Sequence, residues 1–302
     1  MKRILTLAAI LLIAGASLYF VERRPRHDVV TPNAVVDATA DWERDLTLVP
    51  ADMTRISDDE EIRIGNELAM QYQGANAPSD PESQALARYV DQVGKRVSAQ
   101  AHRTMPWQFH VVADPNLINA FALPGGHVFI GRGLLDQMRS EDELAFVLGH
   151  EIEHIDHYHA VERVQWEAQL HHFDLDGVAA IVQISMSVWQ AGYSKDEEFE
   201  ADREGLRLAV AVGYSPQGAL KMLERFKRLD DEYVLHAATP VDELGQVAIE
   251  GLGAYFRSHP LPSERLAQVN EIIAQDHLPA DLRLKPFHLE YEITSHSSKA
   301  GM

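Results

Sequence analysis

The pentapeptide His150-Glu151-Ile152-Glu153-His154 places two imidazoles and two carboxylates in a stretch that otherwise has the composition of a buried helix. Side chains four residues apart on a helix point the same way, so His150 and His154 can direct two nitrogens at one point. Two such nitrogens suit Zn²⁺, and Glu151 can take a proton from a water whose pKa the metal lowers to about 7. The competing interpretation is a polar, solvated helix face, because the chain contains 15 histidines.

A second acidic segment, SKDEEFEADREG at 194–205, offers the remaining groups that such a site needs. A catalytic zinc of this kind uses a third protein ligand, commonly Glu, and leaves the fourth position for water. Glu198 and Asp202 are four residues apart on a predicted helix. One of them can bind the metal while the other accepts the free N–H of a ligand histidine. Taken alone, however, the segment is better explained as an acidic, solvated helix face.

The elements that must position these residues are mostly helical. Ser140 and Glu143 form a capping-box pattern that begins the helix carrying the pentapeptide. Upstream, the apolar Trp107–Ala113 predicts a strand, and two short strands around Pro124-Gly125-Gly126 predict a hairpin. The pattern of apolar residues predicts further helices at Ser57–Gln73, Ser83–Gln100, Asp174–Tyr193, Lys195–Val212, Pro216–Leu229, Val241–Phe256 and Pro262–Ile273.

Composition excludes several classes of protein. With 302 residues and 46% hydrophobic content, the chain is globular and long enough to bury a large core. Its net charge of −19 argues against a nucleic-acid partner, which requires a basic surface. Cysteine is absent, so disulfides, thiolate ligands and a cysteine nucleophile are all excluded.

The N-terminus has the pattern of an export signal. Lys2 and Arg3 precede an apolar run from Ile4 to Phe20, and the small residues Ala14-Gly15-Ala16 would serve as a cleavage site for the export signal. The alternative is an uncleaved membrane anchor near the lower length limit for a span. We therefore expect a signal or anchor at 1–23, a linker at 24–55 and a single folded domain at 56–302.

Four segments in this order resemble the M48 family of zinc metallopeptidases. They are NAFALPGGHVFIGRGLL, LAFVLGHEIEHIDHYHAVER, EFEADREG and SHPLPSERLAQV, and the likeness extends from about Asp59 to Ile273. The resemblance implies an α+β fold: a mainly helical zincin domain of gluzincin-like type, with a small antiparallel sheet beside the helix that carries the histidines.

The resemblance also implies roles for individual residues. One Zn²⁺ per chain would be held by His150, His154 and Glu198, the first glutamate of the family's EFxAD-type motif. Asp202 would fix a ligand histidine, and Glu151 would act as the general base. Glu153 is expected at the surface. The later histidines, His157 and His159, lie at offsets of three and five from His154, so they do not share its zinc-facing direction equally well. His159 is expected to pack or hydrogen-bond within the fold.

The hairpin resembles the sheet edge along which these enzymes align an extended substrate. An edge strand can recognise peptide backbone through its unpaired N–H and C=O groups. His259 and Arg265 match the family's HP…R element: His259 would either donate to the developing oxyanion or occupy the open zinc position, and Arg265 would either support the tetrahedral intermediate or pair with an acidic residue. The candidate substrate-binding residues are Asn119, Ala120, Phe121, Ala122, Leu123, Gly125, Gly126 and His127, with the strand continuing to Ile130.

These features predict a zinc-dependent endopeptidase that cleaves unfolded or extended polypeptides of the cell envelope, as part of protein quality control. We expect export to the periplasm or the periplasmic face of the inner membrane of a Gram-negative-type bacterium, with membrane attachment through residues 4–20 as an option. The oligomeric state is not predicted. The main alternative is a non-catalytic, zinc-binding chaperone-like or scaffold protein. A membrane-embedded prenyl-protein protease ranks last, because only Ile4–Phe20 has the length and composition of a span.

Overall fold

The computed structural model describes residues 56–76, 78–170, 192–236, 259, 262–279 and 282–287 of the chain. The chain divides into two units, Met1–Leu46 and Thr47–Met302, and all described residues belong to the second. The predicted export segment, the linker, the helix at Val241–Phe256 and all but the last two residues of the helix at Asp174–Tyr193 lie outside the described residues, so these expectations stay predictions.

Two helices, α3 (Asp58–Asn76) and α4 (Pro81–Ser98), begin where local capping groups end the preceding loop. The Ser57 hydroxyl accepts a hydrogen bond from the Glu60 N–H over 3.3 Å. The Asp80 carboxylate accepts from the Ser83 N–H over 2.9 Å, and Pro81 supplies the preset first turn, so α4 begins two residues before the predicted start. The buried residues of α4 include Leu86, Val90, Val93 and Val97, which form the predicted apolar stripe.

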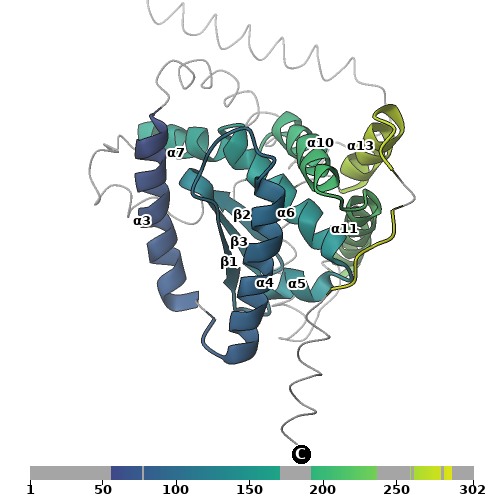
Figure 1. Ribbon diagram of the computed structural model, residues 1–302, viewed down its shortest axis with the longest axis horizontal. Coiled ribbons are helices and arrows are strands. Elements are labelled where there is room, and N and C mark those ends of the chain that lie inside the picture. Colours follow the sequence, from purple (N-terminus) through teal and green to yellow (C-terminus); the bar gives the residue numbers. More distant parts are fainter. Residues whose placement is uncertain are drawn as a thin grey trace, which may run out of the picture. The chain divides into compact units, whose positions relative to one another are not determined.

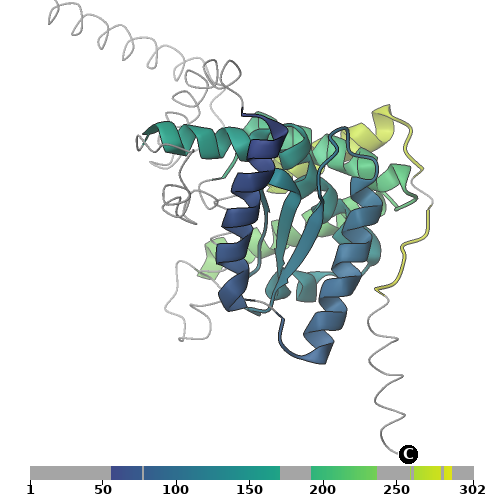
Figure 2. The ribbon, with the colours of Figure 1, turned by 60° about the vertical axis from the view of Figure 1, so that its left-hand side comes forward.

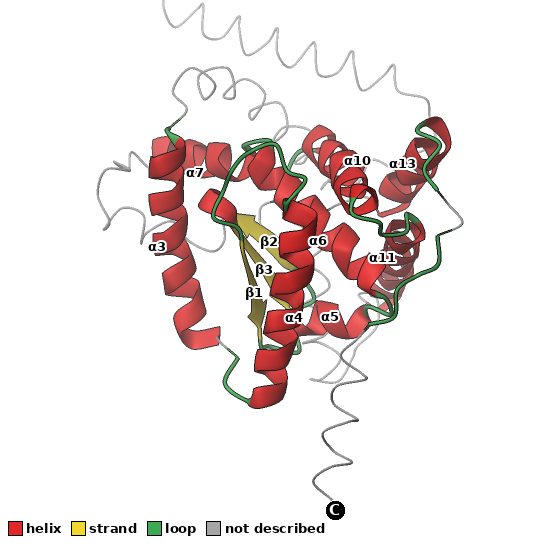
Figure 3. Cartoon of the chain, viewed as in Figure 1, coloured by secondary structure: helices red, strands yellow, loops and turns green. Residues whose placement is uncertain are grey.

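Three strands form a small mixed sheet in the order β1-β3-β2 (Figure 3). They are β1 (Gln108–Val112), β2 (Ala120–Leu123) and β3 (His127–Gly131), and the turn Pro124–Gly126 (η1) joins β2 to β3. β2 pairs antiparallel with β3, as the hairpin pattern predicts. β1 differs from the wholly antiparallel expectation: it pairs parallel with β3, because β3 folds back between β1 and β2.

The helix that carries the pentapeptide, α6 (Glu141–Asp156), lies at the centre of the domain, and all its residues are buried. Ser140 caps it by accepting a hydrogen bond from the Glu143 N–H over 3.3 Å. Glu143 turns its carboxylate to the Arg139 N–H, 2.6 Å away, so only one half of the expected capping box is present. Two short helices flank α6: α5 (Arg132–Gln137) and α7 (His159–Leu170).

Three helices complete the domain on the side of α6 away from α3: α10 (Lys195–Ala211), α11 (Gln217–His236) and α13 (Pro262–Gln275) (Figures 1 and 2). The expected fold class is confirmed, since the protein is mainly helical with one small sheet beside α6. Within the described part of the chain, no helix combines the length and the apolar character that crossing a membrane requires.

A buried ion pair ties α3 to the hairpin and to the end of α6. The Arg103 guanidinium pairs with Glu61 of α3 and also donates to the Ile155 carbonyl over 2.7 Å. The Glu61 carboxylate in turn accepts from the Gly125 N–H over 3.0 Å. Glu61 is 1% exposed, so this network is shielded from water, and salt screens such buried ion pairs much less than exposed ones. The network fixes the β2–β3 turn relative to the C-terminal end of α6.

Candidate metal and active site

Helix α6 presents His150 and His154 on one buried face. Their Nε2 atoms lie 3.2 Å apart, and the two rings meet edge to face. His150 is 3% exposed and His154 is fully buried. The solvated helix face that competed with a metal site in the sequence is therefore excluded, because neither imidazole reaches water.

Helix α10 brings a carboxylate to the same point. It begins with a complete capping box, in which Ser194 and Glu197 exchange side-chain and backbone hydrogen bonds. One residue later, Glu198 directs Oε2 to within 3.5 Å of His150 Nε2 and Oε1 to within 3.5 Å of His154 Nε2. Glu198 is 1% exposed and Asp202 is fully buried, so this stretch is not the solvated acidic face that it resembles in the sequence.

The two helices meet through glycine. A Cβ placed on Gly149 of α6 would lie 2.5 Å from the Gly205 carbonyl oxygen. A Cβ on Gly205 of α10 would lie 2.6 Å from the backbone nitrogen of His150. Backbone therefore packs on backbone beside the histidines, and this close crossing sets how near Glu198 comes to them.

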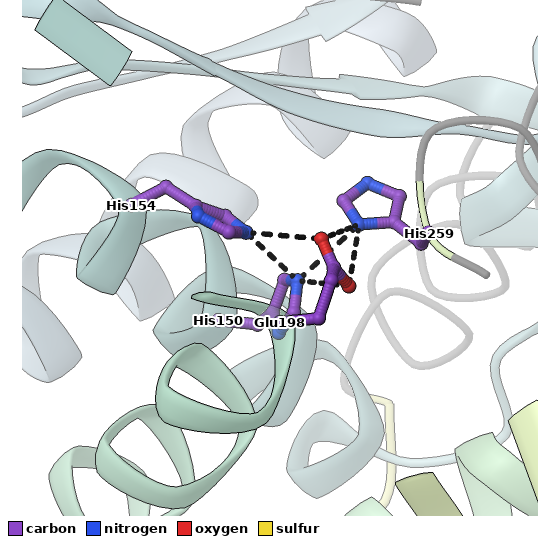
Figure 4. A group of neighbouring side chains, drawn as sticks. All are labelled: His150, His154, Glu198 and His259. Carbon is purple, nitrogen blue, oxygen red and sulfur yellow. Dashed lines mark hydrogen bonds and ion pairs between the residues drawn. The ribbon is translucent and has the colours of Figure 1, made fainter. Parts of the chain in front are cut away.

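His259 is the fourth member of the cluster, as Figure 4 shows. Its Nδ1 lies 3.0 Å from Glu198 Oε1 and 3.3 Å from His150 Nε2. Ligands at about 2.0 to 2.1 Å from a tetrahedral zinc are separated by about 3.3 to 3.4 Å. The donor separations within His150, His154 and Glu198 run from 3.2 to 3.5 Å, so these three residues fit a zinc ion. His259 lies beside them, and one donor atom from each of the four residues falls within 4.8 Å of the others.

Behind the ligands, Asp202 and Arg265 hold His150 and Glu198 in place. Asp202 Oδ1 lies 3.0 Å from His150 Nδ1, which leaves the opposite nitrogen, Nε2, facing the cluster. Arg265 donates two hydrogen bonds of 2.7 Å to the Asp202 carboxylate, and its Nη1 lies 3.3 Å from Glu198 Oε2. Arg265 is 2% exposed, and its contacts with Asp202 and Glu198 are compatible with the expected pairing with an acidic residue.

The charges of the cluster are set by burial and by close partners. Burial alone would raise the pKa of Glu198, but His259, His150 and Arg265 hold it well below its usual range. Burial would likewise raise the pKa of Asp202, and Arg265 keeps it low. Burial lowers the pKa of His154 well below 6.5, so this imidazole stays neutral, which is the form that binds a metal.

Glu151 lies beside the cluster and outside it. Its Oε1 is 3.6 Å from His259 Nε2, while its Oε2 is buried without a hydrogen-bond partner among the described residues. Burial raises the pKa of the Glu151 carboxyl above its ordinary value, although His259 and His150 oppose the rise. A cavity of about 10 Å³ adjoins it, bordered by Ala120, His150 and His259 among others, and this is about the volume that one water requires.

Two features of the neighbourhood were not predicted from the sequence. Glu153 is fully buried and its Oε2 lies 3.1 Å from His157 Nε2, so the expectation of a surface residue is wrong. Tyr193 stacks on His154 with ring centroids 3.6 Å apart. Tyr193 ends a predicted helix in the sequence, and no motif marked it; only its position just before the Ser194 cap of α10 could have drawn attention to it.

The predicted substrate-binding residues divide between the two strands of the hairpin. β2 has only β3 as a partner among the described strands, whereas β3 is paired on both edges, so an edge-strand role is open to Asn119–Leu123 and excluded for His127–Ile130. Asn119 bonds to β3 through its carbonyl, so the alternate residues Ala120 and Ala122 turn their backbone groups to the other edge. The Ala120 carbonyl lies 3.5 Å from His259 Nε2, which places β2 at the cluster.

The hairpin turn and the first residue of β3 face away from the cluster. Gly125 packs against Glu61 and Ile62 of α3, and Gly126 against Met105 and Pro106. The buried His127 makes side-chain contacts with His110 and Asn66, at 3.1 and 3.0 Å. Nothing in this geometry brings Gly125, Gly126 or His127 to the histidine and glutamate donors.

Two histidines one helical turn apart, a glutamate beside the first and a carboxylate from a second helix define the site of a metallopeptidase of the HExxH type. The sequence profile of Peptidase family M48 matches residues 84–273. The chain belongs to this family.

Several curated proteins are similar to most of the described domain. The chain is 30% identical over 226 residues to a putative beta-barrel assembly-enhancing protease of Vibrio cholerae, covering 69% of this chain and 42% of that protein. It is 28% identical over 222 residues to the mitochondrial metalloendopeptidase OMA1 of Arabidopsis thaliana, covering 68% and 42%. The beta-barrel assembly-enhancing protease of Yersinia pestis is 27% identical over 259 residues, covering 76% and 49%. The chain thus spans less than half the length of these relatives.

Proposed function

We propose that the protein is a zinc-dependent endopeptidase that hydrolyses peptide bonds in extended polypeptides. The observation that carries the proposal is the buried set of donor atoms on His150, His154 and Glu198, spaced for one zinc ion, with the carboxylate of Glu151 beside it. Zinc bound there supplies a Lewis acid that polarises the scissile carbonyl and makes water more acidic. The remaining chemistry falls to side chains of the chain itself.

Glu151 is the proposed general base and acid. Its Oε2 has no hydrogen-bond partner among the described residues, so it is available to accept a proton from the attacking water. Burial raises the pKa of the Glu151 carboxyl, which brings it closer to neutral pH and lets the same oxygen return the proton to the leaving amine. One carboxylate thereby serves both halves of the hydrolysis.

His259 is proposed to close the site and to withdraw when a substrate enters. Its Nδ1 stands at ligand spacing from His150 and Glu198, and the cavity beside Glu151 measures only about 10 Å³. A peptide needs far more space than this, so the lining of the cavity has to move before a scissile bond can reach Glu151, and His259 is the proposed moving group. Of the two roles expected from the sequence, occupation of the fourth position is the one that these distances support.

The β2 edge is the proposed site for the substrate backbone. Ala120 and Ala122 turn their backbone groups away from β3, and the Ala120 carbonyl lies near His259. A peptide that added itself to this edge as a further strand would run past Glu151 and would be recognised through its main chain, with little dependence on its sequence. Ala122 is fully buried, so this edge also has to be uncovered before binding.

We place this activity in protein quality control of a bacterial cell envelope. The support is the export-like segment at Ile4–Phe20 together with the similarity to two beta-barrel assembly-enhancing proteases. The names of these two relatives describe proteases that enhance beta-barrel assembly, and the other relative is a mitochondrial metalloendopeptidase. Export, a periplasmic location and unfolded envelope proteins as substrates all belong to the proposal.

The test is incubation of the purified protein with casein or an unfolded envelope protein, with zinc and with a chelator. Zinc-dependent appearance of fragments supports the proposal. Protection of the substrate from aggregation without any fragments would favour the non-catalytic, chaperone-like alternative. Because the site is closed in the structure, short peptides are included as a second substrate, since they require less opening.

A further inference from the structure

The helix that carries the metal ligands stops abruptly after His154. α6 ends at Asp156, α7 begins at His159, and Tyr158 between them has a φ of 66°, which is uncommon for a residue other than glycine. The Arg103 guanidinium lies over the Tyr158 ring, 3.8 Å from its centroid, and donates to the Ile155 carbonyl over 2.7 Å. This contact holds the break in place.

The break brings His159 back onto the ligand helix. On a continuous helix, His159 would lie about 140° around the axis from His154, because each residue turns by about 100°. Instead, His159 Nδ1 lies 3.1 Å from His154 Nδ1, and the ring centroids are 5.3 Å apart. His159 is 6% exposed, so water does not compete for this contact.

A metal at the cluster would decide which nitrogen of each ring carries a proton. His154 Nε2 faces His150 and Glu198, so with a metal bound its lone pair would be used there and its proton would reside on Nδ1. His154 then donates from Nδ1 to the bare Nδ1 of His159. The proton of His159 consequently lies on Nε2, which faces Glu200 Oε2 at 3.6 Å. A chain from ligand to imidazole to carboxylate results.

We infer that His159, backed by Glu200, is a positioning residue that orients the metal ligand His154, as Asp202 orients His150. The inference rests on the proposed zinc site. The two supports differ in character. Asp202 is fully buried and bonded to Arg265, whereas the Glu200 side chain is 36% exposed and lies 3.6 Å from the surface residue Arg203. Within this pair, the buried His159 ring therefore contributes more to the orientation of His154 than Glu200 does.

The test compares zinc affinity in variants of the full chain by competition with a chelator. His159→Phe keeps the ring volume but removes the acceptor, and we expect zinc to bind roughly 10- to 100-fold more weakly, as is typical when a partner of a ligand histidine is lost. His159→Gln restores an acceptor oxygen and should recover part of the affinity. The matched control is His157→Gln. His157 is also an imidazole that contacts Glu153 and Glu200, but no contact joins it to His154 in the described structure.

A second readout separates positioning from a general loss of structure. Nitrogen-detected NMR of the histidine rings in the zinc-free protein should show His154 with its proton mainly on Nδ1 in the wild type and a mixture of both tautomers in His159→Phe. Equal zinc affinity of wild type and His159→Phe would overturn the inference, as would an equal loss in His157→Gln. Failure of the wild type to bind zinc at all would instead refute the proposed function on which the inference rests.

Discussion

The glycine crossing between α6 and α10 predicts that one methyl group in the wrong place will loosen the metal site. In Gly205→Ala, the new Cβ would lie 2.6 Å from the backbone nitrogen of His150, whereas ordinary van der Waals contact begins at 3.4 Å. The helices must therefore separate by about 0.8 Å, and metal sites tolerate deviations of only about 0.2 Å in ligand distance. We expect the free energy of unfolding to fall by about 1 to 3 kcal/mol and zinc to bind at least about 10-fold more weakly.

Urea denaturation measures the first quantity and competition with a chelator measures the second. Gly94→Ala is the matched control, because its Cβ would lie 2.3 Å from the Phe109 ring, on the side of α4 that faces β1. This variant should also lose stability, yet its zinc affinity should equal that of the wild type. Gly205→Ala with unchanged zinc affinity, or an equal loss of affinity in Gly94→Ala, would refute the argument that the crossing sets the donor spacing.

Three further predictions follow from other parts of the domain. Burial lowers the pKa of His127 from 6.5 to about 4, so the unfolded state takes up a proton at this ring before the folded state does, and stability is lost between about pH 6.5 and pH 4. At pH 5 the loss in the free energy of unfolding is about 2 kcal/mol. Urea titrations at pH 7.5 and 5 should show a smaller dependence of stability on pH for His127→Gln than for the wild type, and an equal dependence would contradict the prediction. Ser194→Ala removes the hydroxyl that accepts from the Glu197 N–H and should cost about 1 kcal/mol in thermal or urea unfolding; wild-type stability would show that the cap is unimportant. Metal analysis of Glu198→Ala should find the zinc lost, while Glu200→Ala keeps most of it, and the reverse pattern would mean that the wrong carboxylate has been assigned.

The parts of the site that depend on local spacing could be predicted from the sequence. His150 and His154 are one turn apart on a single helix, and Glu198 and Asp202 repeat that spacing on another, so each pair follows from helix geometry once the helices are recognised. The order of the four motifs supplied the link between the two pairs. Burial of Arg265 against Asp202 could not be derived, because it depends on how α13 packs on α10.

The remaining features depend on tertiary contacts that leave no local pattern. The contact between His159 and His154 arises from the positive φ of Tyr158, and nothing in the sequence HIDHYH marks a break at that residue. Glu153 is polar and was expected at the surface, but α6 is surrounded on all sides and buries it beside His157. The parallel pairing of β1 likewise depends on where β3 inserts in the sheet, which the pattern of a hairpin does not specify.

The most direct measurement of the central claim is zinc content together with hydrolysis products for the wild type and Glu151→Gln. Glu151 is not one of the clustered donors, and glutamine has nearly the same shape, so the variant should hold one zinc per chain with unchanged affinity. Its amide cannot accept a proton from water, so cleavage of casein and of short peptides should fall by roughly 100- to 10,000-fold. Cleavage by Glu151→Gln at close to the wild-type rate, with zinc bound, would contradict the account.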